Sequence, residues 1–223
     1  MTIEQTPFQD AKFAENPEPR CPCVLLLDTS GSMAGKPIAE LNGGLQTLRD
    51  ELLADSLAMK RAEVSIITFG GTVQALIDFT TADQFAAPTL EASGETPMGA
   101  AVETAIQAIE NRKQTYKANG ILYYRPWLFM ITDGAPTDSW QAAAEHARKR
   151  EADKGLVFFA VGVEGANFDV LREFTGKFEP LKLKGLQFRN LFQWLSSSLK
   201  SVSGSKVGDD VAPPPITWGS IPT

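Results

Sequence analysis

The chain has 223 residues, of which 43% are hydrophobic and 22% charged, the composition of an ordinary globular protein. Its 21 basic and 27 acidic residues give a formal net charge of −6. This composition excludes a collagen-like, coiled-coil or wholly disordered chain, and the acidity disfavours general binding to nucleic acid or to an anionic membrane. The length fits one larger α/β domain as well as two small ones.

The first elements along the chain are buried strands and one amphipathic helix. Residues 24–27 form a short continuous apolar run, which is typical of a strand buried on both faces. Residues 36–54 place apolar side chains three and four residues apart, which predicts a helix with one buried face. Residues 64–69 predict a second strand, and a glycine pair then turns the chain into an antiparallel edge strand over residues 73–79.

The later elements continue the alternation of strand and helix. After a helix that begins near Pro97 we expect, in chain order, a buried strand, an alanine-rich helix, a second buried strand, a short helix, a short strand and a last helix, at residues 127–132, 138–153, 156–163, 168–174, 181–183 and 188–199. Such alternation predicts a doubly wound, mostly parallel central sheet with one antiparallel edge strand and helices on both faces, a Rossmann-like α/β fold.

The composition divides the chain into three parts. Residues 1–20 are polar and contain prolines, so we expect an irregular lead-in, followed by the domain at residues 21–202. Residues 203–223 are rich in proline and glycine and are expected to form a tail. Trp218 in this tail is either an exposed anchor for a partner or a side chain that folds back over the domain's own apolar surface.

Targeting signals and cysteine usage point to one compartment. The N-terminus lacks a basic segment followed by an apolar one, and no apolar run approaches the roughly 20 residues that span a bilayer. The only two cysteines, Cys21 and Cys23, flank one proline, which favours two reduced thiols at the start of a strand over a disulfide framework or a metal site. These features predict a cytoplasmic protein without membrane contact.

Polar residues cluster where the parallel strands of the predicted sheet end. Asp28, Ser30 and Ser32 follow the first buried strand in one tight loop, and Asp133 directly follows the strand at residues 127–132. Thr96 lies in a separate loop that leads into a helix, where Pro97 is expected at the first helical position and Thr96 at or near the N-cap. Ligands of such sheets bind outside the carboxyl ends of the strands, so we expect these side chains to meet there.

The five residues offer two carboxylates and three hydroxyls, a set that suits a hard cation. Mg²⁺ prefers oxygen ligands and keeps several waters, and no histidine or cysteine is placed to favour zinc or copper. We therefore expect one Mg²⁺, with Mn²⁺ or Ca²⁺ as alternatives, held by Asp28, Ser30, Ser32, Thr96 and Asp133. Serines that merely cap the next helix would explain Ser30 or Ser32, but not Thr96 and Asp133.

The pattern Asp28-x-Ser30-x-Ser32, with Thr96 and Asp133 far along the chain, resembles the metal-ion-dependent adhesion site of von Willebrand factor A domains. The resemblance covers roughly residues 22 to 200. It implies that the three hydroxyls contact the metal and that the two aspartates often act through water. It also implies a non-enzymatic, protein-binding module.

In such a module the remaining coordination position is filled by an Asp or Glu of the partner protein. A metal already held by two carboxylates carries little net charge, which still allows it to attract one more. Residues of the same loops, together with the tail tryptophan, are the candidate partner contacts: Gly31, Met33, Glu95, Gly134 and Trp218.

A narrower resemblance concerns the segments Pro22–Met33, Gly35–Ile38, Asn42–Leu45, Arg125–Trp127 and Thr132–Asp138. They are similar to the TerY-type bacterial proteins of tellurium-resistance and stress clusters. This resemblance implies a scaffold or regulator in phosphorylation signalling, with a protein kinase or a PP2C-type phosphatase as the partner. No residue points to tellurite binding itself.

Two other function classes stay open: a metal-dependent phosphoryl-transfer hydrolase, and a subunit of a chelatase or ATPase assembly. A phosphatase of the haloacid dehalogenase type needs a second aspartate where this chain has Ser30. A serine hydrolase would need a general base close to Ser30 or Ser32. The only histidine, His146, lies in the alanine-rich helix and is not expected to fill this role. The basic stretch Arg148–Arg150 is interpreted as a solvated helix face rather than a nucleic-acid site.

Overall fold

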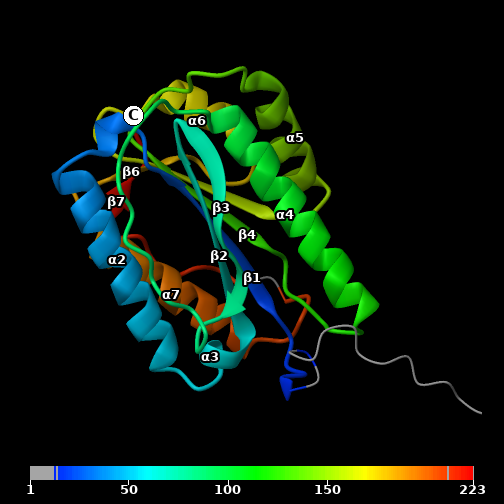
Figure 1. Cartoon of the computed structure of the whole chain (residues 1–223). Coiled ribbons are helices and arrows are strands. Elements are labelled where there is room, and N and C mark those ends of the chain that lie inside the picture. The colour runs from blue at the N-terminus through cyan, green and yellow to red at the C-terminus, as the bar shows by residue number, and fades with distance from the viewer. Residues whose placement is uncertain (1–12, 14, 210, 223) are drawn as a thin grey trace, which may run out of the picture.

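Seven strands form one sheet within the part of the chain that the computed structural model describes, namely residue 13, residues 15–209 and residues 211–222 (Figure 1). In spatial order the strands are β3 (Thr72–Thr81), β2 (Ala62–Gly70), β1 (Cys21–Asp28), β4 (Trp127–Thr132), β5 (Val157–Gly162), β6 (Leu181–Leu183) and β7 (Gly219–Ser220). The five central strands are parallel, and β3 and β7 pair antiparallel at the two edges. The predicted fold class is confirmed, with β3 as the expected edge strand and β7 as a second one.

Helices cover both faces of this sheet, as the sequence predicts. The helical elements are, in chain order, η1 (Gly31–Met33), α2 (Lys36–Leu53), α3 (Ala58–Arg61), α4 (Met98–Ala118), α5 (Gln141–Ala152), α6 (Phe168–Phe174) and α7 (Phe188–Gly204). α2 and α7 lie side by side on one face, and α4 and α5 lie on the other (Figure 1). The sheet therefore separates two hydrophobic cores.

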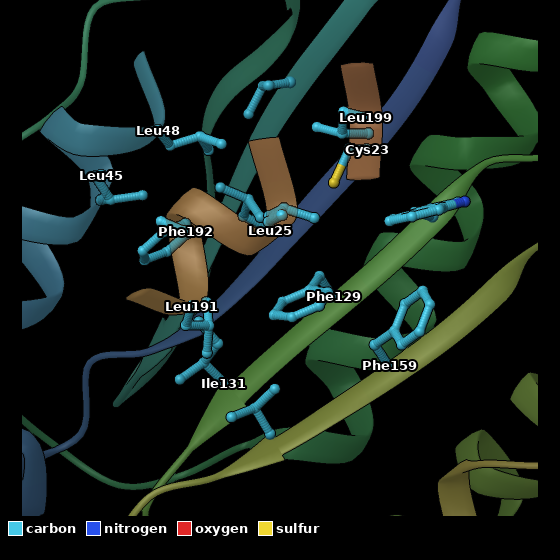
Figure 2. Packing of buried hydrophobic residues seen from close by; sticks show 14 of the residues in the cluster. Cys23, Leu25, Leu45, Leu48, Phe129, Ile131, Phe159, Leu191, Phe192 and Leu199 are labelled. Carbon is cyan, nitrogen blue, oxygen red and sulfur yellow. The ribbon is translucent and has the colours of Figure 1, made fainter. Parts of the chain in front are cut away.

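β1 is the central strand of both cores. Along its pleat Cys23 and Leu25 point toward α2 and α7, whereas Val24 and Leu26 point toward α4 and α5. Figure 2 shows side chains of α2 and α7 directed at this strand. Every residue of β1 is buried, which is why the sequence reads as a continuous apolar run here rather than as an alternation.

The C-terminal segment folds back onto the domain. Trp218 is fully buried, and its ring centroid lies 5.5 Å from that of Trp194 in α7. Trp194 Nε1 donates a hydrogen bond to Pro214 O at 2.8 Å, and β7 extends the sheet beyond β6. The expectation of Trp218 as an exposed partner contact is therefore wrong, because its indole covers apolar surface of the domain itself. The alternative, a tail that folds back, is what the structure shows.

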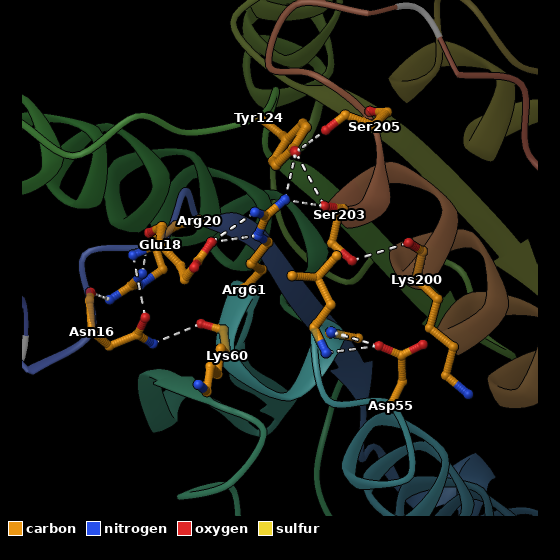
Figure 3. A network of polar contacts seen from close by, with 12 residues as sticks. Asn16, Glu18, Arg20, Asp55, Lys60, Arg61, Tyr124, Lys200, Ser203 and Ser205 are labelled. Atoms are coloured by element: carbon orange, nitrogen blue, oxygen red, sulfur yellow. Dashed lines mark hydrogen bonds and ion pairs between the residues drawn. The ribbon is translucent and has the colours of Figure 1, made fainter.

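Polar contacts tie the chain together at the pole opposite the carboxyl ends of the strands (Figure 3). Arg61 of α3 donates to Ser203 O at the end of α7 at 2.6 Å and forms an ion pair with Glu18 at 2.7 Å. Tyr124 OH donates to Ser205 O at 2.6 Å. The described end of the lead-in and the end of α7 are thereby attached to the same corner of the domain.

Cys21 and Cys23 are free, buried thiols within β1, in agreement with the predicted reduced pair. Among the described residues, no helix combines the length and the apolar character needed to cross a bilayer. The lead-in predicted at residues 1–20 lies outside the described residues at positions 1–12 and 14.

Candidate metal centre

The first loop of the site begins where β1 ends. Asp28 is fully buried, and its Oδ1 accepts a hydrogen bond from Ser30 N at 2.8 Å, the side-chain turn that aspartate favours. Gly31 N donates to Gly94 O at 2.9 Å, which joins this loop to the one that precedes α4. Ser30 is buried and Ser32, the next serine, is exposed at the start of η1.

Ser30, Ser32 and Asp133 are linked by hydrogen bonds that connect two loops. The two serine hydroxyl oxygens are 3.0 Å apart, and Ser32 Oγ donates to Asp133 Oδ1 at 2.7 Å. This contact exists because β1 and β4 are adjacent parallel strands, so the residues that follow them meet at one edge of the sheet. The structure thus brings together ligand candidates that lie 101 residues apart in the chain.

Thr132, the last residue of β4, holds the buried aspartate from the other side. Its Oγ1 donates to Asp28 Oδ2 at 2.5 Å and accepts a hydrogen bond from Gly134 N at 3.2 Å. Both oxygens of Asp28 are therefore positioned by the chain. Thr132 was not among the predicted site residues, although its place at the carboxyl end of a strand was a usable signal.

Thr96 reaches the same region from a third loop. A Cβ placed on Gly134 would lie 3.3 Å from Thr96 Oγ1 and 3.8 Å from Asp28 Oδ2, so the threonine hydroxyl and the buried carboxylate both lie beside Gly134. Thr96 N donates to Thr137 Oγ1 at 3.1 Å, and Thr137 N donates to Thr96 O at 2.9 Å. This reciprocal pair fixes the Thr96 loop to the loop that carries Asp133.

The start of α4 differs from the prediction. The helix begins at Met98 rather than Pro97, and Pro97 occupies the N-cap position with φ −75° and ψ 66°. Asp138 instead supplies the cap from the neighbouring loop, because its carboxylate accepts hydrogen bonds from Gly99 N at 3.0 Å and Ala100 N at 2.9 Å. Thr96 is therefore not the N-cap, so its hydroxyl is not used to cap this helix. Asp138 is a second residue that the sequence analysis missed.

The electrostatics of the site favour a bound cation. Burial raises the pKa of Asp28, hydrogen bonds from Ser30 and Thr132 lower it, and the nearby charge of Asp133 raises it again. In the described part of the chain neither aspartate forms an ion pair with Lys or Arg. Two carboxylates removed from water without a cationic partner attract a positive ion.

The donor chemistry also fits the expected metal. The converging side chains present carboxylate and hydroxyl oxygens, the ligands of hard cations such as Mg²⁺. Within the described residues, no three His, Cys, Asp or Glu side chains gather as a metal site. The hydroxyls must therefore complete any ligand set here, as the pattern of the five predicted residues requires.

The predicted partner contacts have different surroundings. Gly31 and Glu95 are exposed and Gly134 is partly exposed, so these three positions lie open beside the metal residues. Met33 is fully buried, and the expectation that it contacts a partner is wrong. Its side chain belongs to the core under α2, because η1 turns it inward from the loop.

Other side chains weighed from the sequence lie away from this centre. His146 of α5 has its Nδ1 2.9 Å from Glu103 Oε2 of α4 at the surface. Arg148 pairs with Glu173 at 2.8 Å, and Arg150 pairs with Glu110. Arg148 thus forms a surface ion pair, in keeping with a solvated helix face, whereas Arg150 is partly buried.

The fold and the site together define a class: a doubly wound α/β domain whose ligand site lies at the carboxyl end of its sheet and is built from oxygen donors. The family model of the von Willebrand factor type A domain matches residues 23–181. This chain therefore belongs to the von Willebrand factor type A domain family. No curated protein matches it.

Solved structures share this fold at low sequence identity. The pilus adhesin SpaC of Lactobacillus rhamnosus GG, in an open conformation, gives a TM-score of 0.66 at 12% identity over 82% of this chain and 30% of the adhesin. BatB of Bacteroides thetaiotaomicron gives 0.55 at 19% identity over 82% of this chain and 98% of BatB. Proximal thread matrix protein 1 of the mussel byssus, in a form with a zinc-occupied metal-ion-dependent adhesion site, gives 0.56 at 16% identity over 82% and 48%. The chain spans about half the length of the first structures it matches, 45% to 48%.

Proposed function

We propose that this domain binds one Mg²⁺ through Asp28, Ser30, Ser32, Thr96 and Asp133 and uses it to capture a carboxylate of a protein partner. The observation that carries the proposal is the convergence of ligand oxygens from three separate loops. Hydrogen bonds link Ser30 to Ser32 and Ser32 to Asp133, and the Thr96 hydroxyl lies beside Gly134. A polar loop that served only to cap a helix would not recruit residues from three elements.

The exposure pattern supports a site whose inner side is held by hydrogen bonds and whose outer side faces the solvent. Asp28 is fully buried and held by Ser30 and Thr132, whereas Ser32 is exposed to the solvent. When bound, the metal would offer at the surface a coordination position that a partner's Asp or Glu can fill. Zinc occupies the corresponding motif of the mussel thread protein, which agrees with a divalent ion at such a site.

We propose a bacterial, cytoplasmic setting in which the domain is a non-enzymatic scaffold or regulator of a stress or tellurium-resistance phosphorylation system. The support is the TerY-like segments around β1 and β4, which include Thr132 and Asp138, residues that the structure shows positioning the site. A kinase or a PP2C-type phosphatase is the expected partner. Against an enzymatic role stands the surface pairing of His146 with Glu103, which keeps this base in α5 and away from the serines.

Partner capture from a bacterial lysate, in Mg²⁺ and again in EDTA, tests the proposal. We expect a kinase or phosphatase to be retained only with Mg²⁺, to be lost with Thr96→Ala, and to be recovered with Thr96→Ser, which restores the hydroxyl. Partners that ignore both EDTA and Thr96→Ala would contradict metal-bridged capture. Phosphoester turnover that disappears with Asp28→Ala would favour the hydrolase instead, and an ATPase among the retained proteins would favour the chelatase-type assembly.

A further inference from the structure

A large cavity lies at the pole opposite the proposed metal centre. Its volume is about 730 Å³, within the range of small-molecule sites. Its walls come from the C-terminal half of α4, the end of α5 with the turn after it, the amino ends of β4 and β5, and the loop before β6. No part of the proposed function uses this cavity.

Two cations in its wall share a single carboxylate. Lys113 Nζ lies 2.9 Å from Glu110 Oε1, and Arg150 pairs with the same oxygen. Lys113 is 9% exposed, and Arg150 Nε is buried with no hydrogen-bond partner in the described part of the chain. A buried donor without an acceptor costs stability unless a ligand satisfies it, and here the surrounding charge is already positive.

Four more cations line the same cavity, and for three of them no side-chain hydrogen bond or ion pair exists within the described residues. These three are Lys117, one helical turn beyond Lys113 on α4, Arg125 and Lys154. Of the described acidic residues in the wall, Glu151 is already engaged, since it accepts hydrogen bonds from the backbone N–H groups of three residues. Asp153 and Asp209 also line the cavity.

Lys154 has an unusual backbone for its residue type. Its φ of 57° is the only positive value at a non-glycine position among the described residues, and it lies just past the end of α5, where glycine is the usual residue. The next residue, Gly155, could adopt a positive φ without strain, yet the positive φ falls on the lysine. Strained residues of this kind cluster at binding and catalytic sites.

Aromatic rings form the other part of the wall. Phe178 is partly exposed and stacks on Phe159 with ring centroids 4.8 Å apart, and Tyr123 is partly exposed and stacks on Tyr116 at 5.2 Å. The cavity is too large for a lone inorganic anion, and its lining combines flat rings with unpaired cations. This pairing suits a ligand that has both an aromatic ring and a charged phosphate chain.

We propose that this cavity binds a nucleotide, with its phosphates against Lys113, Arg150 and Lys154 and its base against the exposed faces of Tyr123 or Phe178. The inference is independent of the metal centre and of its partner. It assigns the domain a second site, for a small molecule, that does not include any of the five predicted metal ligands.

Calorimetric titration of the full chain with ATP, GTP, CTP and UTP, all in EDTA, tests this proposal. The chelator prevents a phosphate bound to metal at the other pole from imitating the signal. We expect at least one nucleotide to bind about tenfold more tightly than both pyrophosphate and the matching nucleoside. Binding of pyrophosphate that equals that of every nucleotide, or no binding at millimolar concentration, would overturn the proposal.

Lys154→Gly separates binding from folding. Glycine relaxes the strained backbone, so the midpoint of urea unfolding should stay or rise, while nucleotide affinity should fall about tenfold. Arg125→Ala should weaken binding likewise. Lys149→Ala, at an exposed position of α5 that does not line the cavity, is the matched control. It should change neither the unfolding midpoint nor the nucleotide affinity. Nucleotide affinity that is the same in Lys154→Gly, Arg125→Ala and Lys149→Ala would place the ligand elsewhere and overturn the inference.

Discussion

Thr132 shows how one hydroxyl can support a proposed metal ligand without being a ligand itself. Its side chain is fully buried, donates to Asp28 and accepts from the backbone of Gly134. It thus orients the least accessible carboxylate of the site and the loop that carries Asp133. A residue that orients a ligand is commonly worth a large part of the affinity of a metal site.

Thr132→Val removes this hydroxyl while nearly keeping the shape of the side chain. We expect it to reduce the free energy of unfolding by about 2 kcal/mol, because a buried hydrogen bond to a carboxylate is lost. Affinity for Mn²⁺ should fall about tenfold, and Thr132→Ser should restore it. Urea unfolding and calorimetric metal titration measure the two effects. Unchanged metal affinity in the valine variant would show that Asp28 needs no such support.

The buried thiols of β1 give a pH-dependent prediction. Burial raises the pKa of Cys21 to about 12 and that of Cys23 also well above its ordinary value of 9.0. The unfolded chain ionises first, so the thiols' contribution to stability is complete below pH 9.0 and is lost as the pH rises toward 12. Unfolding free energy should therefore fall more steeply over this range in the parent chain than in Cys21→Ala/Cys23→Val. Equal slopes would contradict it.

Spacing along the chain was sufficient to predict that the loops after β1 and β4 meet, because each of these loops follows a strand whose pattern is clear. It was not sufficient for Thr132 and Asp138, whose importance lies in contacts across loops. Met33 shows the opposite failure. It stands in a polar loop, yet the turn of η1 directs it into the core, and only the backbone path reveals this.

At the scale of elements, the start of α4 is controlled by a neighbouring loop rather than by its own sequence. Asp138 accepts from two of the first backbone N–H groups of the helix, and its negative charge lies at the positive end of the helix dipole. Thr137, the residue before Asp138, forms two hydrogen bonds with Thr96: its Oγ1 accepts one from Thr96 N, and its N donates one to Thr96 O. The loop after β4 thus sets the position of the helix and of Thr96 together.

Asp138→Ala should lower the free energy of unfolding by about 1 kcal/mol, the usual cost of losing an N-terminal cap. Asp138→Asn keeps an acceptor oxygen and should lose less. Hydrogen exchange of the first turn of α4 provides the local readout. Protection at Gly99 and Ala100 should decrease in the alanine variant while the strands remain protected. An unchanged exchange rate there would mean that solvent replaces the cap without penalty.

The long elements were predictable because hydrophobic periodicity extends over several turns or over a whole buried strand. α2 and β4 match their predicted ranges within one residue. α3 and β7 were not predicted, since four and two residues are too short to show a period. α7 continues beyond residue 199 through serines whose hydroxyls bond back to the helix, and such residues give no apolar signal.

At the scale of the whole molecule, the two ends of the sheet carry different kinds of contact. The carboxyl ends of β1 and β4 carry the proposed metal ligands. At the opposite pole Arg61 of α3 contacts the described end of the lead-in and the end of α7 (Figure 3). Residues beyond 204 add Trp218 to the first core and β7 to the sheet. Composition alone left docking on the domain and docking on a partner both open, because a few apolar residues among prolines and glycines do not show which surface they cover.

Trp218→Ala tests whether this docking stabilises the domain. We expect a loss of about 3 to 5 kcal/mol in the free energy of unfolding, as for other buried aromatic side chains. Trp218→Phe should cost less, because Trp218 Nε1 has no hydrogen-bond partner in the described part of the chain. Ile221→Ala, at a position 60% exposed, is the control and should be nearly neutral. A neutral Trp218→Ala would contradict the docked tail.

The most direct test of the account is calorimetric titration of the chelator-treated chain with Mg²⁺ and Mn²⁺. We expect one binding site, weakened about tenfold or more by Ser32→Ala, a variant at an exposed position that leaves the fold intact. Ser93→Ala, in the exposed loop that leads to Thr96, should bind as the parent does. Absence of binding, or equal binding in Ser32→Ala and Ser93→Ala, would contradict the claim that these loops form a metal site.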